Sequence, residues 1–175
     1  MIKMKYIITL LLLCSATLNS YSQSLSYMDW VDRSAKYIEN NKLDSAAIAL
    51  YNAMSLEPAH ESNPVLLLNL GILQRQLGQY DDSYISFTAS LTNNPIPDIV
   101  LHNRASLLVD MGRYEEAMED YNAILVDFPH DVEAFYRRGV LHLENHDRVK
   151  AEADFKRSEE IDPDNMFTKL SKALI

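Results

Sequence analysis

The feature that most constrains this chain is a regular spacing between prolines. Pro95, Pro129 and Pro163 lie 34 residues apart, and each is expected to end a helix because proline cannot continue the backbone hydrogen-bond ladder. Three further sets of positions keep the same period: small residues (Gly71, Ala105, Gly139), aromatic residues (Phe87, Tyr121, Phe155) and large apolar residues (Leu67, Leu101, Phe135). A period of this length predicts a stack of repeated units, each containing two helices.

One helix of such a unit can be followed in "YEEAMEDYNAILVDFPHD", residues 114–131. Its apolar residues recur at the spacing of an amphipathic helix. Glu115 and Glu116 open the segment, where the helix dipole favours negative charge, and Pro129 closes it. The segment carries no obvious catalytic group, which indicates that its role is packing.

The segment "LHNRASLLVDMGRYEEAMEDYNAILVDFP", residues 101–129, resembles the tetratricopeptide repeat, and residues 135–163 match the same pattern. The resemblance implies an all-α fold, a right-handed α-solenoid of about four helix-turn-helix units with a C-terminal capping helix. We place the repeats at 27–60, 64–97, 98–131 and 132–165, with three extra residues in the loop "PAHESNP". Stacking is expected to bury the apolar face that each helix pair cannot bury alone.

Residues 165–175 are expected to form the cap. Asp164 or Asn165 can cap this helix, and one apolar stripe is predicted to cover the last repeat: Met166, Phe167, Leu170, Ala173 and Leu174. We favour a lid over the alternative of a partner-binding helix.

Residues 1–22 have the form of a bacterial export signal. Lys3 and Lys5 precede a short apolar run, and Ser20 and Ser22 supply the small residues of a cleavage site. Cleavage after Ser22 leaves residues 23–175 as the repeat domain of a periplasmic or secreted protein. The apolar run is short for a membrane span, so we expect no integral span after removal of the signal, and an uncleaved anchor remains as an alternative.

Cys14 is the single cysteine. Lipidation there would anchor the protein, but we favour a bystander because Leu13, not a small residue, precedes it. A processed chain would hold no cysteine, which excludes disulfides, zinc-thiolate sites and a cysteine nucleophile.

The charge and the motifs exclude several function classes. Removing residues 1–22 takes the formal net charge from -9 to -11, and an acidic chain without a basic cluster is a poor candidate for binding nucleic acid. His142 and His146 are four residues apart, but "HLENH" is not the H-E-x-x-H motif of zinc enzymes. We therefore predict no metal, no cofactor and no enzymatic activity.

The family resemblance implies a concave groove lined by the first helix of each repeat. Asn69, Asn103 and Arg137 share one repeat position, where amides can hold a peptide backbone and a guanidinium can hold a carboxylate. The predicted partner-binding residues are Asn69, Asn103, Arg137, His102, Tyr136, Leu68 and Ile72. Two positions of the family's carboxylate clamp match, but Leu68, Ile72 and Glu133 occupy the others, so we reject binding of chaperone tails.

The function predicted from the sequence is a scaffold that binds a peptide or protein segment in its groove within an exported or envelope complex. The alternative is a structural subunit that associates through its convex face or its ends. The oligomeric state, the partner and the pathway stay open.

Overall fold

The computed structural model describes residues 24–174 of the chain, and these residues form nine helices and no strand. The expected signal segment and Cys14 lie outside the described residues. In chain order the helices are α2 (Tyr27–Glu39), α3 (Leu43–Leu56), α4 (Asn63–Gln76), α5 (Tyr80–Ser90), α6 (Pro97–Asp110), α7 (Tyr114–Asp127), α8 (Val132–Glu144), α9 (Arg148–Ile161) and α10 (Met166–Ser171).

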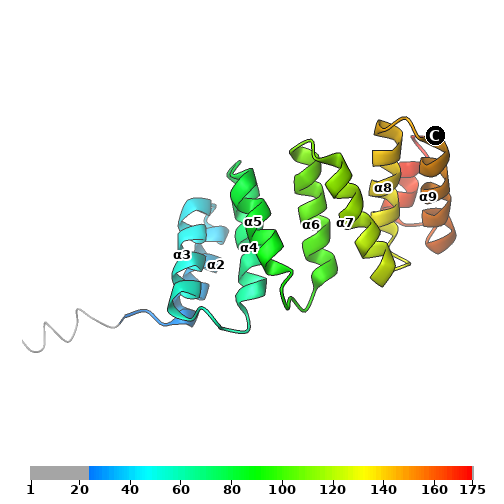
Figure 1. Cartoon of the computed structure of the whole chain (residues 1–175). Coiled ribbons are helices and arrows are strands. Elements are labelled where there is room, and N and C mark those ends of the chain that lie inside the picture. The colour runs from blue at the N-terminus through cyan, green and yellow to red at the C-terminus, as the bar shows by residue number, and fades with distance from the viewer. Residues whose placement is uncertain (1–23, 175) are drawn as a thin grey trace, which may run out of the picture.

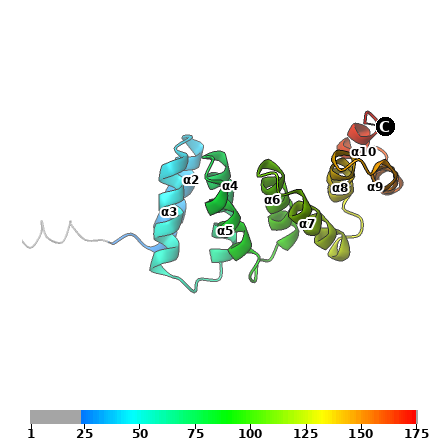
Figure 2. The same ribbon diagram turned by 45° about the horizontal axis from the view of Figure 1, so that its top comes forward.

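The helices pair into four hairpins that stand side by side in a row from the N-terminal to the C-terminal end (Figure 1). We call them units one to four, α2–α3, α4–α5, α6–α7 and α8–α9. In each unit the first helix is the A helix and the second is the B helix. The view in Figure 2 shows the same stacking, with α10 beside α8 and α9. The prediction of an all-α solenoid is confirmed.

The turn between the A and B helices has one backbone design in every unit. Each turn has three residues, and the second of them has a positive φ: Asn41 (54°), Gly78 (74°), Gly112 (71°) and His146 (58°). A left-handed conformation suits glycine, which has no Cβ to clash with the carbonyl, and asparagine tolerates it. This repeated turn places each B helix antiparallel to its A helix.

Side-chain caps fix several helix starts. Ser26 and Asp29 form a capping box at α2, in which each side chain bonds the other residue's backbone N–H. The carboxylate of Asp131 accepts from the backbone N–H of Ala134 at 2.7 Å at the start of α8. Asp147 does the same for Lys150 at α9, at 3.2 Å. Such caps satisfy backbone donors that have no partner inside the helix.

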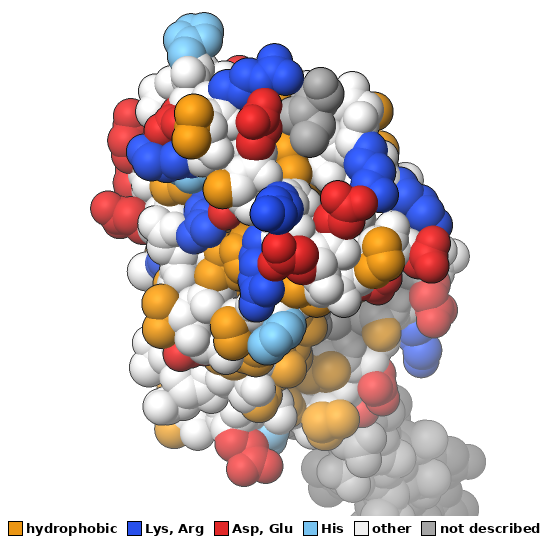
Figure 3. Space-filling model, turned by 90° about the vertical axis from the view of Figure 1, so that its right-hand side faces the viewer, with side chains coloured by type: hydrophobic (Ala, Val, Ile, Leu, Met, Phe, Trp, Pro, Cys, Tyr) orange, Lys and Arg blue, Asp and Glu red, His pale blue; other side chains and the backbone are white. Residues whose placement is uncertain are grey.

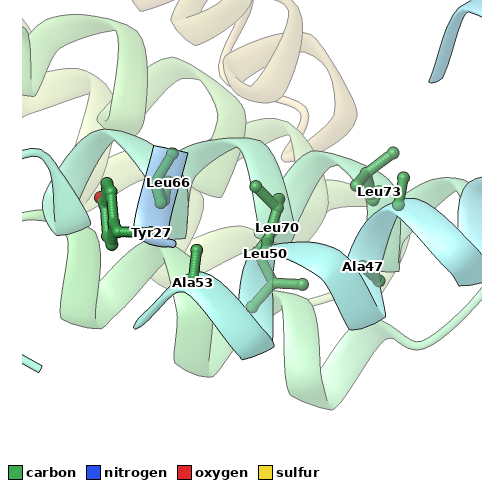
Figure 4. Packing of buried hydrophobic residues seen from close by; sticks show 8 residues of the cluster. Tyr27, Ala47, Leu50, Ala53, Leu66, Leu70 and Leu73 are labelled. Atoms are coloured by element: carbon green, nitrogen blue, oxygen red, sulfur yellow. The ribbon is translucent and has the colours of Figure 1, made fainter. Parts of the chain in front are cut away.

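The core is built from small and large apolar residues that meet between hairpins. In units one and two, side chains of α2, α3 and α4 form one buried cluster (Figure 4), which includes Tyr27, Ala47, Leu50, Ala53, Leu66, Leu70 and Leu73. Phe87 of α5 lies in a second cluster with Val100 and Leu107 of α6. The aromatic residue at this repeat position thus packs between neighbouring units.

Two glycines allow the A and B helices of their units to approach closely. A Cβ at Gly71 would lie 2.6 Å from the ring of Phe87, and one at Gly139 would lie 2.4 Å from the ring of Phe155. These distances are far below van der Waals contact, so a side chain would push the ring away. The small residues at this repeat position thus mark where the two helices of a unit come closest.

Two arginines tie three helices together in units three and four. Arg104 forms a bidentate pair with Asp120 at 2.6 and 2.9 Å, and also donates to Thr88 of the preceding unit at 3.2 Å. Thirty-four residues later, Arg138 pairs with Asp154 at 2.6 and 2.9 Å and donates to Asn122 at 2.8 Å. Hydrogen bonding to Asp120 raises the pKa of Arg104, despite the opposing effect of burial.

Unit two makes the equivalent tie without charge. Leu70 and Ser86 stand where units three and four have the arginine and the aspartate. The buried side chain of Gln74 donates to the hydroxyl of Tyr51 in unit one at 3.2 Å and accepts from Ser86 at 2.6 Å. The tetratricopeptide pattern usually has a large apolar or aromatic residue where Gln74 stands, and the two hydrogen bonds explain how its amide is accommodated.

The cap differs from the predicted stripe. Helix α10 ends at Ser171, and Met166, Leu170 and Leu174 are exposed by 64%, 45% and 45%. The buried contact between α10 and the end of α9 is polar. The hydroxyl of Thr168 donates to the backbone carbonyl of Asp162 at 2.8 Å, and it lies 2.7 Å from the hydroxyl of Ser158. Apolar and charged side chains are interspersed over this end of the molecule (Figure 3).

Candidate functional site

The A helices of units two to four line a hollow surface that we call the A-helix groove. Its first part encloses about 320 Å³ and is lined by Arg75, Ile99, His102, Asn103, Ser106, Glu133 and Arg137. Its second part encloses about 250 Å³ and is lined by Ser106, Val109, Asp110, Tyr121, Tyr136, Arg137, Val140 and Leu141. Because Ser106 and Arg137 line both parts, the groove continues from α4 across α6 to α8.

Paired charges cross the floor of the groove. Arg75 of α4 pairs with Asp110 of α6 at 2.6 Å and donates to the hydroxyl of Ser106 at 3.0 Å. Arg137 pairs with Glu133 at 2.6 Å within α8. Both pairs are about one-third exposed, so ligand groups can reach them. An exposed pair contributes only about 0.2–1 kcal/mol, so a ligand carboxylate can replace an internal partner at small cost.

The environment of Arg137 keeps it charged. Burial acts to lower its pKa, but hydrogen bonding to Glu133 and the neighbouring acidic groups outweigh burial, and the pKa is raised. Its guanidinium also lies 5.7 Å from the ring centre of Phe167 in α10, within the range of a cation–π contact. The cap thereby helps to hold one wall of the groove.

His102 connects the groove to the start of α8. Its Nε2 lies 3.0 Å from Asp131, the residue that caps α8. Burial acts to raise the pKa of Asp131, but the hydrogen bonds from His102 and the backbone prevail and lower it. Within the described residues, the buried Nδ1 of His102 has no hydrogen-bond partner. The imidazole therefore has a structural contact on one nitrogen and an unused polar atom on the other.

The structure brings together part of the predicted site. Asn103 and Arg137 line the same part of the groove, whereas Asn69 is exposed and does not line it. Asn103 donates one amide N–H to the carbonyl of Ile99 at 2.8 Å, and its carboxamide oxygen accepts no hydrogen bond from residues 24–174. This oxygen is a free acceptor for a peptide N–H.

The predicted apolar residues lie at different depths. Leu68 is 4% exposed and packs with Phe87 in the core, so it does not form a ligand-contacting floor. Ile72 packs against the same cluster. Tyr136 lines the second part of the groove, with its ring centre 5.4 Å from that of Phe167. The apolar surface that a ligand can reach comes instead from residues such as Ile99, which is 43% exposed.

Arg75 lines the groove but is absent from the residues predicted from the sequence, because it does not share the repeat position of Asn69, Asn103 and Arg137. Opposite charges at Arg75 and Asp110, near the ends of successive A helices, were the available signal.

A metal site at His142 and His146 has little support in residues 24–174. His142 lies in α8 but His146 lies in the turn after it, so the two do not share a helix face. No group of three or more potential metal ligands occurs among the described residues. None of the described helices is both long and apolar enough to span a membrane.

Comparison with known proteins identifies the repeat. Residues 102–165 match the family model of the tetratricopeptide repeat. The chain has the tetratricopeptide-repeat fold. A crystal structure of a tetratricopeptide repeat protein from Parabacteroides merdae is 34% identical with a TM-score of 0.80, and the match covers 85% of this chain and 58% of that one. The comparison thus supports the tetratricopeptide repeat family for this chain.

Two more distant matches extend the comparison. YrrB, described as having an unusual peptide-binding site, is 19% identical with a TM-score of 0.72, over 86% of this chain and 76% of that one. At this identity the likeness shows the fold alone. The DnaJ homolog subfamily C member 7 homolog of Dictyostelium discoideum is 25% identical over 142 residues. That match spans 74% of this chain but only 26% of the relative.

Proposed function

We propose that the A-helix groove binds an extended segment of a protein partner. The observation that carries this proposal is the groove itself, in which three successive A helices contribute exposed polar and apolar groups to one continuous surface. Proteins with this repeat bind proteins or peptides and are generally non-catalytic scaffolds. We infer the same role here, without catalysis and without nucleic acid as a partner.

The contacts available to the segment follow from the geometry. The free carboxamide oxygen of Asn103 can accept a backbone N–H of the segment, and Arg137 can exchange Glu133 for a carboxylate of the partner. Ile99, one helical turn before Asn103 on α6, offers an exposed apolar contact. A segment with an acidic side chain beside an apolar one fits this order of groups.

Photo-crosslinking in the native cell tests this proposal. A crosslinking amino acid at Ile99 lies in the groove, and one at Ile85, which is 64% exposed on α5 and does not line it, serves as the control. We expect a partner crosslinked from position 99, lost in Asn103→Ala/Arg137→Ala and kept in Arg157→Ala, whose exposed pair lies on α9. Equal crosslinking from position 85 would contradict groove binding.

The alternative role, a structural subunit that associates through its convex face, has one observation in its favour. Ile48 and Ile85 occupy the same repeat position on the B helices of units one and two, and are 59% and 64% exposed. Tyr51 beside them is 50% exposed. In Ile48→Ser/Ile85→Ser this role predicts a smaller assembly in sedimentation, whereas groove binding predicts no change.

We also propose that the protein is exported after cleavage of residues 1–22. The support is the sequence of this segment, with two lysines before a short apolar run. Mass spectrometry of the intact protein from its native cell is expected to give the mass of a chain that begins at Gln23. A chain beginning at Cys14 with a lipid would establish a lipoprotein instead, and a chain that keeps residues 1–22 would show an uncleaved anchor.

A further inference from the structure

A second hollow lies at the edge of the solenoid, where α8 turns into α9. It encloses about 340 Å³ between units three and four. Its lining consists of Tyr114, Glu115, Met118, Leu141, His142, Glu144, Asn145 and Lys150. It shares only Leu141 with the A-helix groove. Neither the groove proposal nor the packing of the repeats assigns it a role.

The preceding junction shows what fills this place in the repeat. There the guanidinium of Arg113 lies 4.2 Å from the ring centre of Tyr84. Its Nε and Nη2 atoms donate to the two carboxylate oxygens of Glu116, at 2.6 Å each. The space between units two and three is thus occupied by an arginine of the chain itself, stacked on an aromatic ring and paired with a carboxylate.

The residues at the same repeat positions in the next junction are reversed in charge. Asp147 stands for Arg113, Lys150 for Glu116, and Met118 for Tyr84. Lys150 pairs with Asp147 at 2.7 Å, so its ammonium is already neutralised at the rim. The exchange of Arg113 and Tyr84 for smaller side chains accounts for the open volume.

The walls of the open hollow still suit a cation. Tyr114 is 48% exposed, and it offers an aromatic face. Glu115 and Glu144 are exposed on the rim, and among the described residues neither forms an ion pair. His142 at the base has Asp154 as its nearest carboxylate, at 3.9 Å, which is too far for a hydrogen bond. The hollow therefore combines apolar walls with two uncompensated negative charges.

We propose that this hollow binds an arginine side chain of a partner protein. The guanidinium stacks on Tyr114 and pairs with Glu115 and Glu144, which are the same two kinds of contact that Arg113 makes with Tyr84 and Glu116 one unit earlier. The aliphatic stem packs over Met118 and Leu141. Arginine is favoured over lysine because its planar cation both stacks on an aromatic ring and forms two parallel hydrogen bonds to a carboxylate. The site is independent of the groove.

The test uses a blocked tripeptide, acetyl-Gly-Arg-Gly-amide, and its citrulline counterpart, which has nearly the same shape without charge. Binding is followed by the NMR signal of the ¹³C-labelled methyl group of Met118, with Met28 and Met54 in unit one as internal references. We expect a saturable shift at Met118 with the arginine peptide. A citrulline or lysine peptide that binds equally well would overturn the assignment, as would no shift up to about 20 mM.

Two variants locate the contact. Glu115→Gln/Glu144→Gln is expected to weaken binding about five- to tenfold, whereas Glu119→Gln, an exposed change on the same helix outside the hollow, leaves it unchanged. Equal losses in the two variants would indicate a general charge effect and overturn the site.

A third variant copies the preceding junction into this one. Met118→Tyr/Asp147→Arg/Lys150→Glu should place the chain's own arginine in the hollow and abolish peptide binding. A thermal melt checks that this variant folds, and the double glutamine variant, which changes only exposed side chains, does not depend on that check. Undiminished binding in a folded copy variant would place the peptide elsewhere and refute the proposal.

Discussion

Unit two and unit three have the same turn between their helices, at Gly78 and Gly112, but hold these helices together by different chemistry. Unit three uses the buried pair of Arg104 and Asp120, which also reaches back to α5. Unit two uses the neutral amide of Gln74, which reaches back to α3 through Tyr51. The comparison shows that the repeat requires a link across three helices and does not require a particular pair of side chains to make it.

The largest expected effect comes from breaking only one half of the charged link. Asp120→Ala leaves the guanidinium of Arg104 without its partner in a site where the aspartate is 5% exposed, and is expected to lower the free energy of unfolding by about 3 kcal/mol. The matched change in unit two, Ser86→Ala, should cost about 1 kcal/mol because only a neutral hydrogen bond is lost. Urea denaturation of the two variants measures the difference.

The double change Arg104→Leu/Asp120→Ser copies the residues of unit two into unit three. Removing both charges together avoids an unpaired ion, so the loss is expected to stay below about 1.5 kcal/mol. If the double variant were less stable than Asp120→Ala, the charged pair itself and not the unpaired cation would carry the stability.

The next largest effect comes from the same substitution made in unit two and in unit four. Gly71→Ala and Gly139→Ala each place a Cβ against a phenylalanine ring, and overpacking of this kind costs about 1–3 kcal/mol. We expect the two losses to agree within about 1 kcal/mol because the geometry is the same. Thermal unfolding measures both, and Gly71→Ala with no loss would show that the ring of Phe87 moves freely.

The cap offers a smaller effect. Thr168→Val keeps the shape of the side chain but removes the hydroxyl that bonds α10 to Ser158 and Asp162, and is expected to cost about 1–2 kcal/mol. Hydrogen exchange should then become faster in α10 and α9 while α4 and α5 keep their protection. Unchanged exchange in α9 would mean that the cap contributes little to the unit beneath it.

The smallest effect concerns the position that holds Gln74 in unit two and His142 in unit four. Burial lowers the pKa of His142 below its ordinary value of 6.5, and the attraction of Asp154 only partly opposes this. Because the unfolded chain takes up the proton first, stability is expected to fall as the pH drops below about 6.5 towards the folded pKa. In His142→Gln this part of the pH dependence should disappear from urea titrations, and a dependence that persists would assign it to other groups.

The sequence predicts where helices end and where they come closest, because both depend on the chain's own backbone. Pro129 and Gly139 have roles set by hydrogen bonding and close approach, and their period is visible without a structure. In the predicted cap stripe Phe167 packs against Tyr136, but Met166 and Leu170 are exposed although both lie within α10. Helix α10 ends at Ser171, and Thr168 docks through a hydroxyl that a count of apolar residues ignores.

The candidate site was only partly predictable for a related reason. A repeat position identifies which residues face the groove, as for Asn103, but it does not give the depth of Leu68 or the reach of Arg75 to the next unit. Those depend on how far each side chain extends and on which partner it meets. The hollow beside Tyr114 arises because Asp147 and Lys150 reverse the charges of Arg113 and Glu116. That an open volume results is visible only when the two junctions are compared in the structure.

The two arginine ties share α7, since Arg104 bonds Asp120 and Arg138 bonds Asn122 on that one helix. Helix α7 thereby joins units three and four. The wall of the groove that these two units form is already ordered before a ligand binds. A segment that binds there loses its own freedom but demands little new ordering of the receptor, which lowers the entropic cost of association. Calorimetry on such a complex should show the ordering of the ligand and almost none of the solenoid.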